Sequence, residues 1–346
     1  MFGTTNSMGV QEFSTYGANV EFHTLHTMSD PYIIQTADSQ SVVMNIGNTD
    51  RTQTYLSQYG MMYKYAYMTP TGQELRFGES QVAYFNNGIP RALVVGYGTN
   101  NLAMTTDFKT FSYVNLTAIS VVSYIAVGNG VALALGWDGK GYFTMGRSTN
   151  VNNNYMSAWS VVTPPTSMLQ GAIGGMVFYK GKFFLPIDEY LYFSTNGINW
   201  QVDSDLPNKP SRWIKVVNGV LFLATTDGSL YLSIDGVNFS DVTPTITKSG
   251  GELEGVELLD IGYSRGMYVL TFDKIDTTDY NSVLINRGTL IGSDIWSRTT
   301  DSQVHFDYQP QRVLGHKGNF IFSAVGAFSS GKDIEIMRRN TLYKLV

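Results

Sequence analysis

A repeated unit of roughly 40–50 residues constrains this chain more than any other feature of its sequence. The clearest copy spans residues 171–202, with strands expected at 172–179, 183–186 and 190–193 and with Trp200 opening a last short strand. A glycine-containing turn separates the first two strands, and a polar turn precedes the aromatic residue. A unit of this size corresponds to one four-stranded blade, which buries its apolar faces only by packing against neighbouring copies.

The same frame can be placed over six segments of the chain. The glycine of the first turn recurs at Gly88, Gly130, Gly181, Gly219, Gly266 and Gly318. The residue that opens the last strand recurs at Phe111, Trp159, Trp200, Phe239, Trp296 and Leu342. Two-residue hairpin turns need positive φ, which glycine and asparagine adopt at little cost. The repeat therefore predicts an all-β fold, a β-propeller of four-stranded blades.

A weaker seventh copy precedes these six. Residues 32–36 and 41–46 are expected to form a hairpin, and residues 63–68 its last strand. Seven blades are favoured, and six blades with a long N-terminal extension are the alternative. We expect residues 1–30 to form an N-terminal arm or lead-in segment and residues 31–346 to form the propeller domain.

The composition agrees with strands and tight turns and excludes several classes of function. Charged residues make up only 15% of the chain, against roughly 25% in typical soluble domains, while Gly, Tyr and Phe are abundant. Basic residues do not form the dense face that nucleic acid requires. The chain has no cysteine, so it has no disulfides and no thiolate metal sites. We expect neither a signal peptide nor a membrane-spanning segment.

One turn sequence occurs twice in nearly identical form, at residues 194–200 and 233–239, with a degenerate third copy at 105–111. The carboxylate or amide in each turn can accept hydrogen bonds from backbone N–H groups two residues on, and the glycine supplies positive φ. The aromatic residue is expected to pack between neighbouring sheets. The predicted structural residues are Ser194, Asn196, Gly197, Trp200, Ser233, Asp235, Gly236, Phe239, Asp107 and Phe111.

These turns resemble the Asp-box, or BNR repeat, of sialidase-like β-propellers. The copies here are one residue shorter between the Asp position and the aromatic residue. In propellers of that family the motif is structural and lies away from the active site, so the resemblance implies a structural role for these residues.

Residues that could carry chemistry are scattered. Sialidase-type catalysis requires an arginine triad and an Arg-Ile-Pro signature, and the closest segment, residues 89–91, has these residues in the wrong order. His23 and His26 have the i, i+3 spacing of a helical metal site, but no helix and no third ligand is expected there. We predict no catalytic residue, no metal site and no cofactor.

The low charge, the richness in Asn, Thr, Tyr and Gly and the missing export signal resemble structural proteins of tailed bacteriophage virions. The resemblance implies a non-enzymatic tail component or attachment protein that contacts other virion proteins or copies of itself. It would be found in the virion after assembly in the host cytoplasm. Two alternatives are a glycan-binding or glycan-cleaving propeller that recognises a host surface glycan, and a bacterial assembly scaffold.

Overall fold

The fold is taken from a computed structural model of the 346-residue chain. The residues that it describes are 10–13, 32–35, 42–46, 53–58, 61–66, 82–96, 101–108, 110–114, 116, 119–140, 142–165, 173–204, 206, 208–248, 251–253, 256–264, 266–273, 283–286, 290, 296–298, 310–316, 319–324 and 342–345.

The described strands form seven four-stranded antiparallel sheets, which we number in chain order. Sheet 1 contains β2 (Tyr32–Gln35), β3 (Val42–Ile46), β4 (Gln53–Gln58) and β5 (Met61–Ala66). Sheet 2 contains β6 (Val82–Asn86), β7 (Pro90–Val95), β8 (Leu102–Thr105) and β9 (Ser112–Tyr113). Sheet 3 contains β10 (Val121–Gly128), β11 (Val131–Trp137), β12 (Phe143–Ser148) and β13 (Ser160–Val162). A short 3₁₀ turn, Val151–Asn153, lies between β12 and β13.

The remaining four sheets follow the same order of strands. Sheet 4 contains β14 (Val177–Tyr179), β15 (Lys182–Ile187), β16 (Tyr190–Ser194) and β17 (Gln201–Val202). Sheet 5 contains β18 (Ser211–Val217), β19 (Val220–Thr225), β20 (Leu230–Ser233) and β21 (Ser240–Asp241). Sheet 6 contains β24 (Leu258–Ser264), β25 (Met267–Phe272), β26 (Val283–Asn286) and β27 (Ser297–Arg298). Sheet 7 contains β28 (Pro310–His316), β29 (Asn319–Ala324), β30 (Leu342–Leu345) and β1 (Val10–Phe13).

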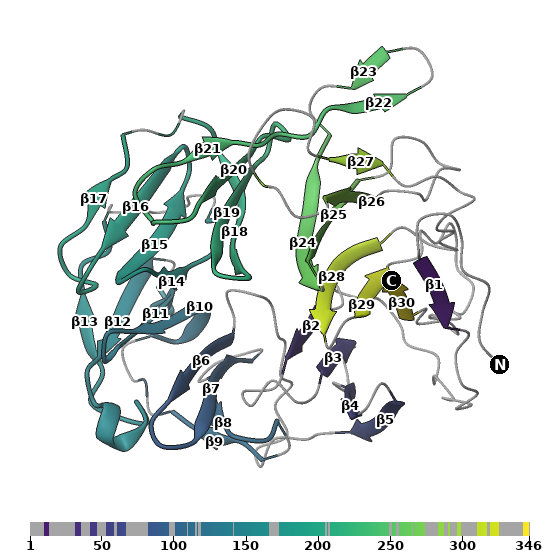
Figure 1. The fold of residues 1–346 in the computed structure, drawn as a ribbon. Helices are drawn as coiled ribbons and strands as arrows, with labels where there is room; N and C mark the ends of the chain where they lie inside the picture. The colour runs from purple at the N-terminus through teal and green to yellow at the C-terminus, as the bar shows by residue number, and fades with distance from the viewer. Residues whose placement is uncertain are drawn as a thin grey trace.

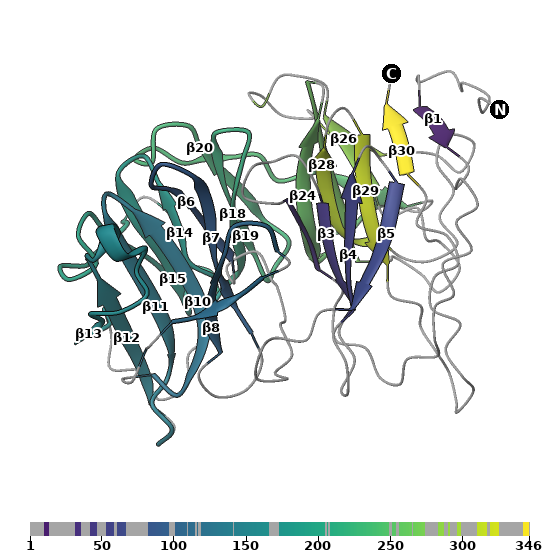
Figure 2. The same ribbon diagram turned by 90° about the horizontal axis from the view of Figure 1, so that it is seen from below.

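The sheets follow one another around a common centre in chain order (Figure 1). The first strand of a sheet lies against the first strand of the next sheet, as β10 does against β14 and β24 against β28. Sheet 7 meets sheet 1 through contacts of β28 and β29 with β2, and Figure 2 shows these two sheets side by side. This arrangement is a β-propeller, which confirms the predicted fold class. The hairpin of β22 (Ile246–Lys248) and β23 (Gly251–Leu253) interrupts the connection from sheet 5 to sheet 6.

The second strands explain why the sequence favours stacked sheets. All six residues of β19 are buried, and so are the first six of β11. A strand with one face in water would alternate between apolar and polar residues, whereas a continuous apolar run requires packing on both faces. The fourth strands of sheets 4 and 5 contain only exposed residues. Burial therefore falls from the inner strands to the outer rim.

The hydrophobic core is a series of clusters, each shared by two adjacent sheets. Sheets 2 and 3 share a cluster around Leu93 and Ile125, and sheets 3 and 4 share one around Leu133 and Phe183. Two further clusters join sheet 4 to sheet 5 and sheet 5 to sheet 6. Sheets 3, 4 and 5 each contribute to two of these clusters, so each of them depends on both neighbours for its burial.

Five of the six predicted anchors directly precede a fourth strand, as Phe111 precedes β9 and Trp296 precedes β27. The sixth expectation is wrong: Leu342 opens β30, which is the third strand of sheet 7. The fourth strand of that sheet is β1, from residues 1–30, and Val10 pairs with Leu345. Sheet 7 is thus completed by a strand from the opposite end of the chain.

Candidate functional site

Three turns connect the third and fourth strands of sheets 2, 4 and 5, and we call them the outer turns (residues 105–111, 194–200 and 233–239). In the second of them, the Ser194 hydroxyl accepts a hydrogen bond from the N–H of Gly197 at 2.9 Å. Asn196 Oδ1 accepts from the N–H groups of Ile198 and Asn199 at 2.9 and 3.0 Å. The turn therefore satisfies its own backbone donors with two side chains.

The third outer turn repeats this scheme with a carboxylate. Asp235 Oδ1 accepts from the N–H groups of Val237 and Asn238 at 2.8 and 2.9 Å, and Asp235 Oδ2 accepts from the Asn238 amide at 2.7 Å. The Ser233 hydroxyl accepts from the N–H of Gly236 at 2.9 Å. The backbone hydrogen bond from Asn238 is the largest of the effects that hold the pKa of Asp235 well below its usual range. The carboxylate is therefore kept ionised by the turn that it organises.

Each outer turn of sheets 4 and 5 is also tied to the preceding sheet. Arg147 Nε, on β12, donates to the carbonyl of Asn196 at 2.8 Å. The Tyr179 hydroxyl, on β14, donates to the carbonyl of Ile234 at 2.8 Å, and Lys182 Nζ donates to the carbonyl of Gly236 at 3.0 Å. These bonds join sheet 3 to sheet 4 and sheet 4 to sheet 5. The outer turns are therefore also joints, by which we mean places where side-chain hydrogen bonds or ion pairs connect neighbouring sheets.

The aromatic residues of these two turns lie at the margins of the shared clusters. Trp200 packs against the cluster of sheets 3 and 4, and Phe239 packs against that of sheets 4 and 5. Both rings are half-buried, whereas Phe111 in the first outer turn is buried. Their apolar area therefore stabilises the outer edge of each sheet interface.

The first outer turn differs at the glycine position. Phe108 occupies it with φ of +55° and with its ring fully buried. Its N–H donates to the Thr105 hydroxyl at 2.8 Å, and Asp107 Oδ1 accepts from the N–H of Thr110 at 2.8 Å, so the hydrogen-bond scheme is kept. A bulky residue in the left-handed region is strained, and the burial of a phenylalanine ring offsets that strain.

A second set of joints lies on the first strands. Lys215 Nζ, on β18, forms an ion pair with Asp260 Oδ1, on β24, at 2.8 Å, and the two side chains are only 14% and 3% exposed. The N–H of Ile261 donates to the same oxygen, and the N–H of Val313, on β28, donates to Asp260 Oδ2 at 2.8 Å. One carboxylate thus connects sheets 5, 6 and 7.

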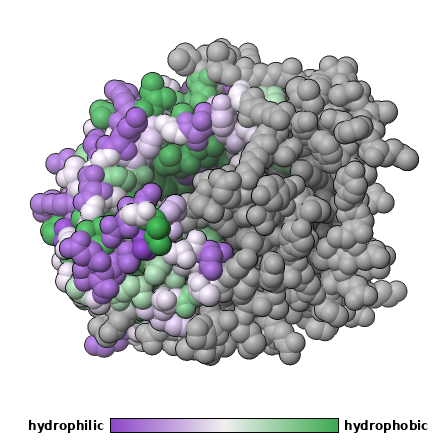
Figure 3. Space-filling view, turned by 60° about the horizontal axis from the view of Figure 1, so that its bottom comes forward, coloured by the Kyte–Doolittle hydropathy of each residue, from purple (hydrophilic) through white to green (hydrophobic). Residues whose placement is uncertain are grey.

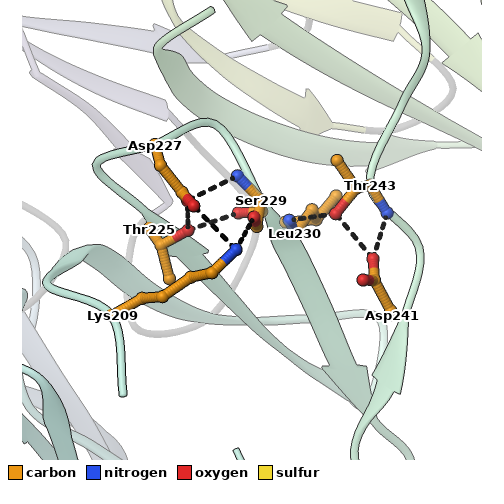
Figure 4. Close-up of polar contacts among 7 residues, drawn as sticks. All are labelled: Lys209, Thr225, Asp227, Ser229, Leu230, Asp241 and Thr243. Atoms are coloured by element: carbon orange, nitrogen blue, oxygen red, sulfur yellow. Dashed lines mark hydrogen bonds and ion pairs between the residues drawn. The ribbon is translucent and has the colours of Figure 1, made fainter. Parts of the chain in front are cut away.

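A polar cluster closes the turn between β19 and β20 (Figure 4). Lys209 Nζ lies 2.7 Å from Asp227 Oδ2 and donates to the Ser229 hydroxyl at 2.9 Å. Burial alone raises the pKa of Asp227, but hydrogen bonds from Lys209, Thr225 and Ser229 lower it well below its usual range. Beside this cluster, Asp241 accepts from the N–H and hydroxyl of Thr243, which in turn accepts from the N–H of Leu230. The cluster holds the segment that enters β18 against sheet 5.

The described surface shown in Figure 3 is mostly hydrophilic, with hydrophobic residues in small groups. Two exposed tyrosines follow the turns between the second and third strands of adjacent sheets: Tyr142 is 52% exposed and Tyr190 is 42% exposed. Ile234 and Val237, in the third outer turn, are also more than half exposed. These residues are available for contacts with other molecules.

Sequence reasoning missed the joints made by single side chains. Asp260 and Lys215 are 45 residues apart in the chain and carry no motif. Asn101, which bonds to the backbone of Val122 in sheet 3, directly precedes β8 and belongs to no motif either. The available signal was an ionisable or amide residue within, or directly before, an otherwise largely apolar strand. His23 and His26 lie outside the described part of the chain.

Within the described residues, no three His, Asp or Glu side chains lie close enough together to hold a metal ion. The search for helices that could cross a bilayer, made over the same residues, finds none of sufficient length and apolarity.

Comparison with known proteins supports the fold. No protein-family model matches the chain, and a search of curated proteins gives no significant match. Among solved structures, YCF48 from Cyanidioschyzon merolae has a TM-score of 0.58 at 10% identity, over 97% of this chain and 98% of that protein. Virginiamycin B lyase from Staphylococcus aureus has a TM-score of 0.55 at 12% identity, over 97% and 98% of the two chains.

A third structure, the GH74 enzyme of Niastella koreensis, has a TM-score of 0.54 at 15% identity. The match covers 93% of this chain but only 43% of that enzyme. At these identities the likeness shows the fold alone. Because the similar structures include proteins named as enzymes and one that is not, the fold does not decide between catalysis and binding.

Proposed function

We propose that this chain is a non-enzymatic structural or attachment protein of a bacteriophage tail, which works through contacts with other virion proteins or with copies of itself. The observation that carries the proposal is that several polar side chains form hydrogen bonds between neighbouring sheets. Arg147, Tyr179, Lys182 and Asp260 all bond across sheet boundaries. Such groups give a rigid ring, and a rigid ring with a polar, sparsely charged surface suits repeated contacts in an assembly.

The outer turns are part of this proposal. We regard residues 194–200 and 233–239 as shortened Asp-boxes, because a hydroxyl, an amide or carboxylate and a glycine organise each turn in the same order. Their role is structural: they fasten each sheet to the preceding one and leave Ile198, Ile234 and Val237 exposed at the rim.

The test is the composition of particles. Phage particles released from the host cell would be purified on a density gradient and their proteins quantified by mass spectrometry against a coat protein of the same particles. A fixed copy number in intact particles supports the proposal. Absence from the particles, with the protein remaining in the soluble lysate, would contradict it.

The exposed tyrosines favour one second candidate, a glycan-binding propeller. Tyr142 directly precedes β12 and Tyr190 opens β16, so both present amphipathic rings near the start of a third strand, where a sugar face could stack. A glycan array probed with the wild-type protein and with a Tyr142→Ser/Tyr190→Ser variant would test it. Binding by the wild type that the double variant loses supports glycan recognition, and an array without signal excludes it for the glycans displayed.

A further inference from the structure

Four asparagines in the described chain are followed directly by glycine: Asn87, Asn129, Asn196 and Asn218. An asparagine in this position can lose its side-chain amide without an enzyme. The backbone nitrogen of the next residue attacks the side-chain carbonyl carbon, and glycine offers the least steric hindrance to that attack because it has no Cβ. The four sites therefore share a reactive sequence, but the structure places them in different surroundings.

The Asn129-Gly130 dipeptide, in the turn between β10 and β11, is open to solvent. Asn129 and Gly130 are both exposed, and no atom lies within 4 Å of the position that a Cβ on Gly130 would occupy. Gly197 is the opposite case. It is buried, its N–H donates to the Ser194 hydroxyl at 2.9 Å, and a Cβ placed on it would lie 2.4 Å from Leu133 Cδ2. The nucleophile next to Asn129 can move and meet water, whereas the one next to Asn196 is engaged and enclosed.

The consequence of losing the amide also depends on its partner. Asn129 Nδ2 donates to the carbonyl of Gly181 at 3.1 Å and so joins sheet 3 to sheet 4. A carboxylate cannot donate to a carbonyl, and the two oxygens would repel each other. Asn218 Nδ2 meets the Tyr268 hydroxyl at 3.1 Å instead. That hydroxyl can turn its proton towards a carboxylate, so the join between sheets 5 and 6 would survive the same change.

We propose that Asn129 is a site of spontaneous deamidation, and that its conversion loosens the join between sheets 3 and 4. The Gly130 nitrogen forms a bond to Asn129 Cγ, and the Cγ–Nδ2 bond breaks. Ammonia leaves with the proton from the attacking nitrogen, and a five-membered succinimide remains. Water then opens the ring at either carbonyl, which gives aspartate or isoaspartate at position 129. The step needs no reactant other than water, and it does not depend on the role proposed for the protein.

The first test follows the chemistry in the full-length protein. The purified chain is incubated in mildly alkaline buffer, and its peptides are analysed by mass spectrometry for the mass gain of deamidation. We expect Asn129 to convert several-fold faster than Asn196 in the folded protein, and the two to convert at similar rates in denaturant. Equal rates in the folded protein, or faster loss at Asn196, would overturn the proposal.

The second test follows the consequence. Asn129→Asp reproduces one product, and Asn218→Asp is its matched control, because aspartate tolerates the left-handed backbone at both turns. Asn129→Asp should lower Tm by roughly 2 °C and speed amide hydrogen exchange at residues 179–182, while Asn218→Asp changes neither. An Asn129→Asp protein that melts and exchanges as the wild type does would refute the loosening.

Discussion

The ammonium group of Lys215 lies 2.8 Å from the carboxylate of Asp260, and both side chains are almost completely removed from water. The pair does more than neutralise two charges. Because Asp260 also accepts the N–H of Val313, the same carboxylate fixes β18, β24 and β28 relative to one another. The innermost strands of three sheets thus share one polar joint within an apolar surrounding.

Replacing Asp260 by alanine should therefore lower the free energy of unfolding by about 3–5 kcal/mol, since it removes one partner of a buried pair. Denaturant titration of the full chain measures this loss. Arg212→Ala is the matched control, because Arg212 pairs with Glu257 at a site where both side chains are much more exposed. Its cost should stay within about 1 kcal/mol. Equal losses for the two variants would show that the buried Asp260 pair contributes no more to stability than the more exposed Arg212 pair.

The periodic elements of the fold could be predicted because their signals are local. A continuous apolar run such as residues 220–224 requires burial on both faces, and Asn218-Gly219 marks the turn before it. Phe239 marks the start of a fourth strand because its ring must reach the shared cluster. These signals lie within a few residues of the structure that they specify.

Joints between sheets could not be predicted in the same way. The pairing of Val10 with Leu345 depends on ring closure, and nothing near Leu342 indicates that the next strand comes from the other end of the chain. Asp260 meets Val313 across 53 residues, and no repeat signal relates them. The sequence of residues 105–111 indicates a degenerate copy of the turn, but the strain at Phe108, which holds the glycine position, is visible only in the backbone conformation.

Alanine substitutions at Gly197 and Gly219 distinguish the stability cost of backbone strain from that of a packing clash. Both have positive φ, +71° and +72°, so alanine at either position should cost about 1–2 kcal/mol of folding free energy. A Cβ at Gly219 meets nothing within 4 Å, whereas one at Gly197 would clash with Leu133. Gly197→Ala should therefore cost about 1–3 kcal/mol more than Gly219→Ala in denaturant titration. Equal costs would contradict the close contact between this turn and sheet 3.

Asp235 should make the stability of the fold depend on pH. Its pKa in the folded protein lies below the unfolded value of about 3.9, so the ionised carboxylate stabilises the fold above that value. This contribution is lost as the pH falls below about 4. Asp235→Asn keeps an acceptor, as Asn196 does in the neighbouring turn, and should lose less stability than the wild type between neutral and acidic pH. Thermal melts of both proteins across this range give the comparison. Identical pH profiles would show that Asp235 does not contribute to the pH dependence of stability.

Replacing Asn101 by aspartate leads to a prediction with the opposite dependence of stability on pH. Its Nδ2 donates to the carbonyl of Val122 and its Oδ1 accepts the N–H of Val122, both at 2.8 Å, so one buried amide joins sheet 2 to sheet 3 in both directions. Asn101→Ala leaves two buried backbone groups without these partners and should cost about 1–3 kcal/mol for each. Asn101→Asp keeps the acceptor but places a carboxylate oxygen against a carbonyl.

Burial and this repulsion should raise the folded pKa of the new carboxyl group at position 101, because only its protonated form can donate to the carbonyl of Val122. With the folded pKa above the unfolded value of about 3.9, the Asn101→Asp protein should gain stability relative to the wild type as the pH falls and lose it as the pH rises. Denaturant titrations of Asn101→Asp and Asn101→Ala from neutral pH to about pH 4 distinguish charge from lost bonding. Only the aspartate variant should approach the wild type in acid, and a deficit independent of pH would show that residue 101 does not face Val122 as described.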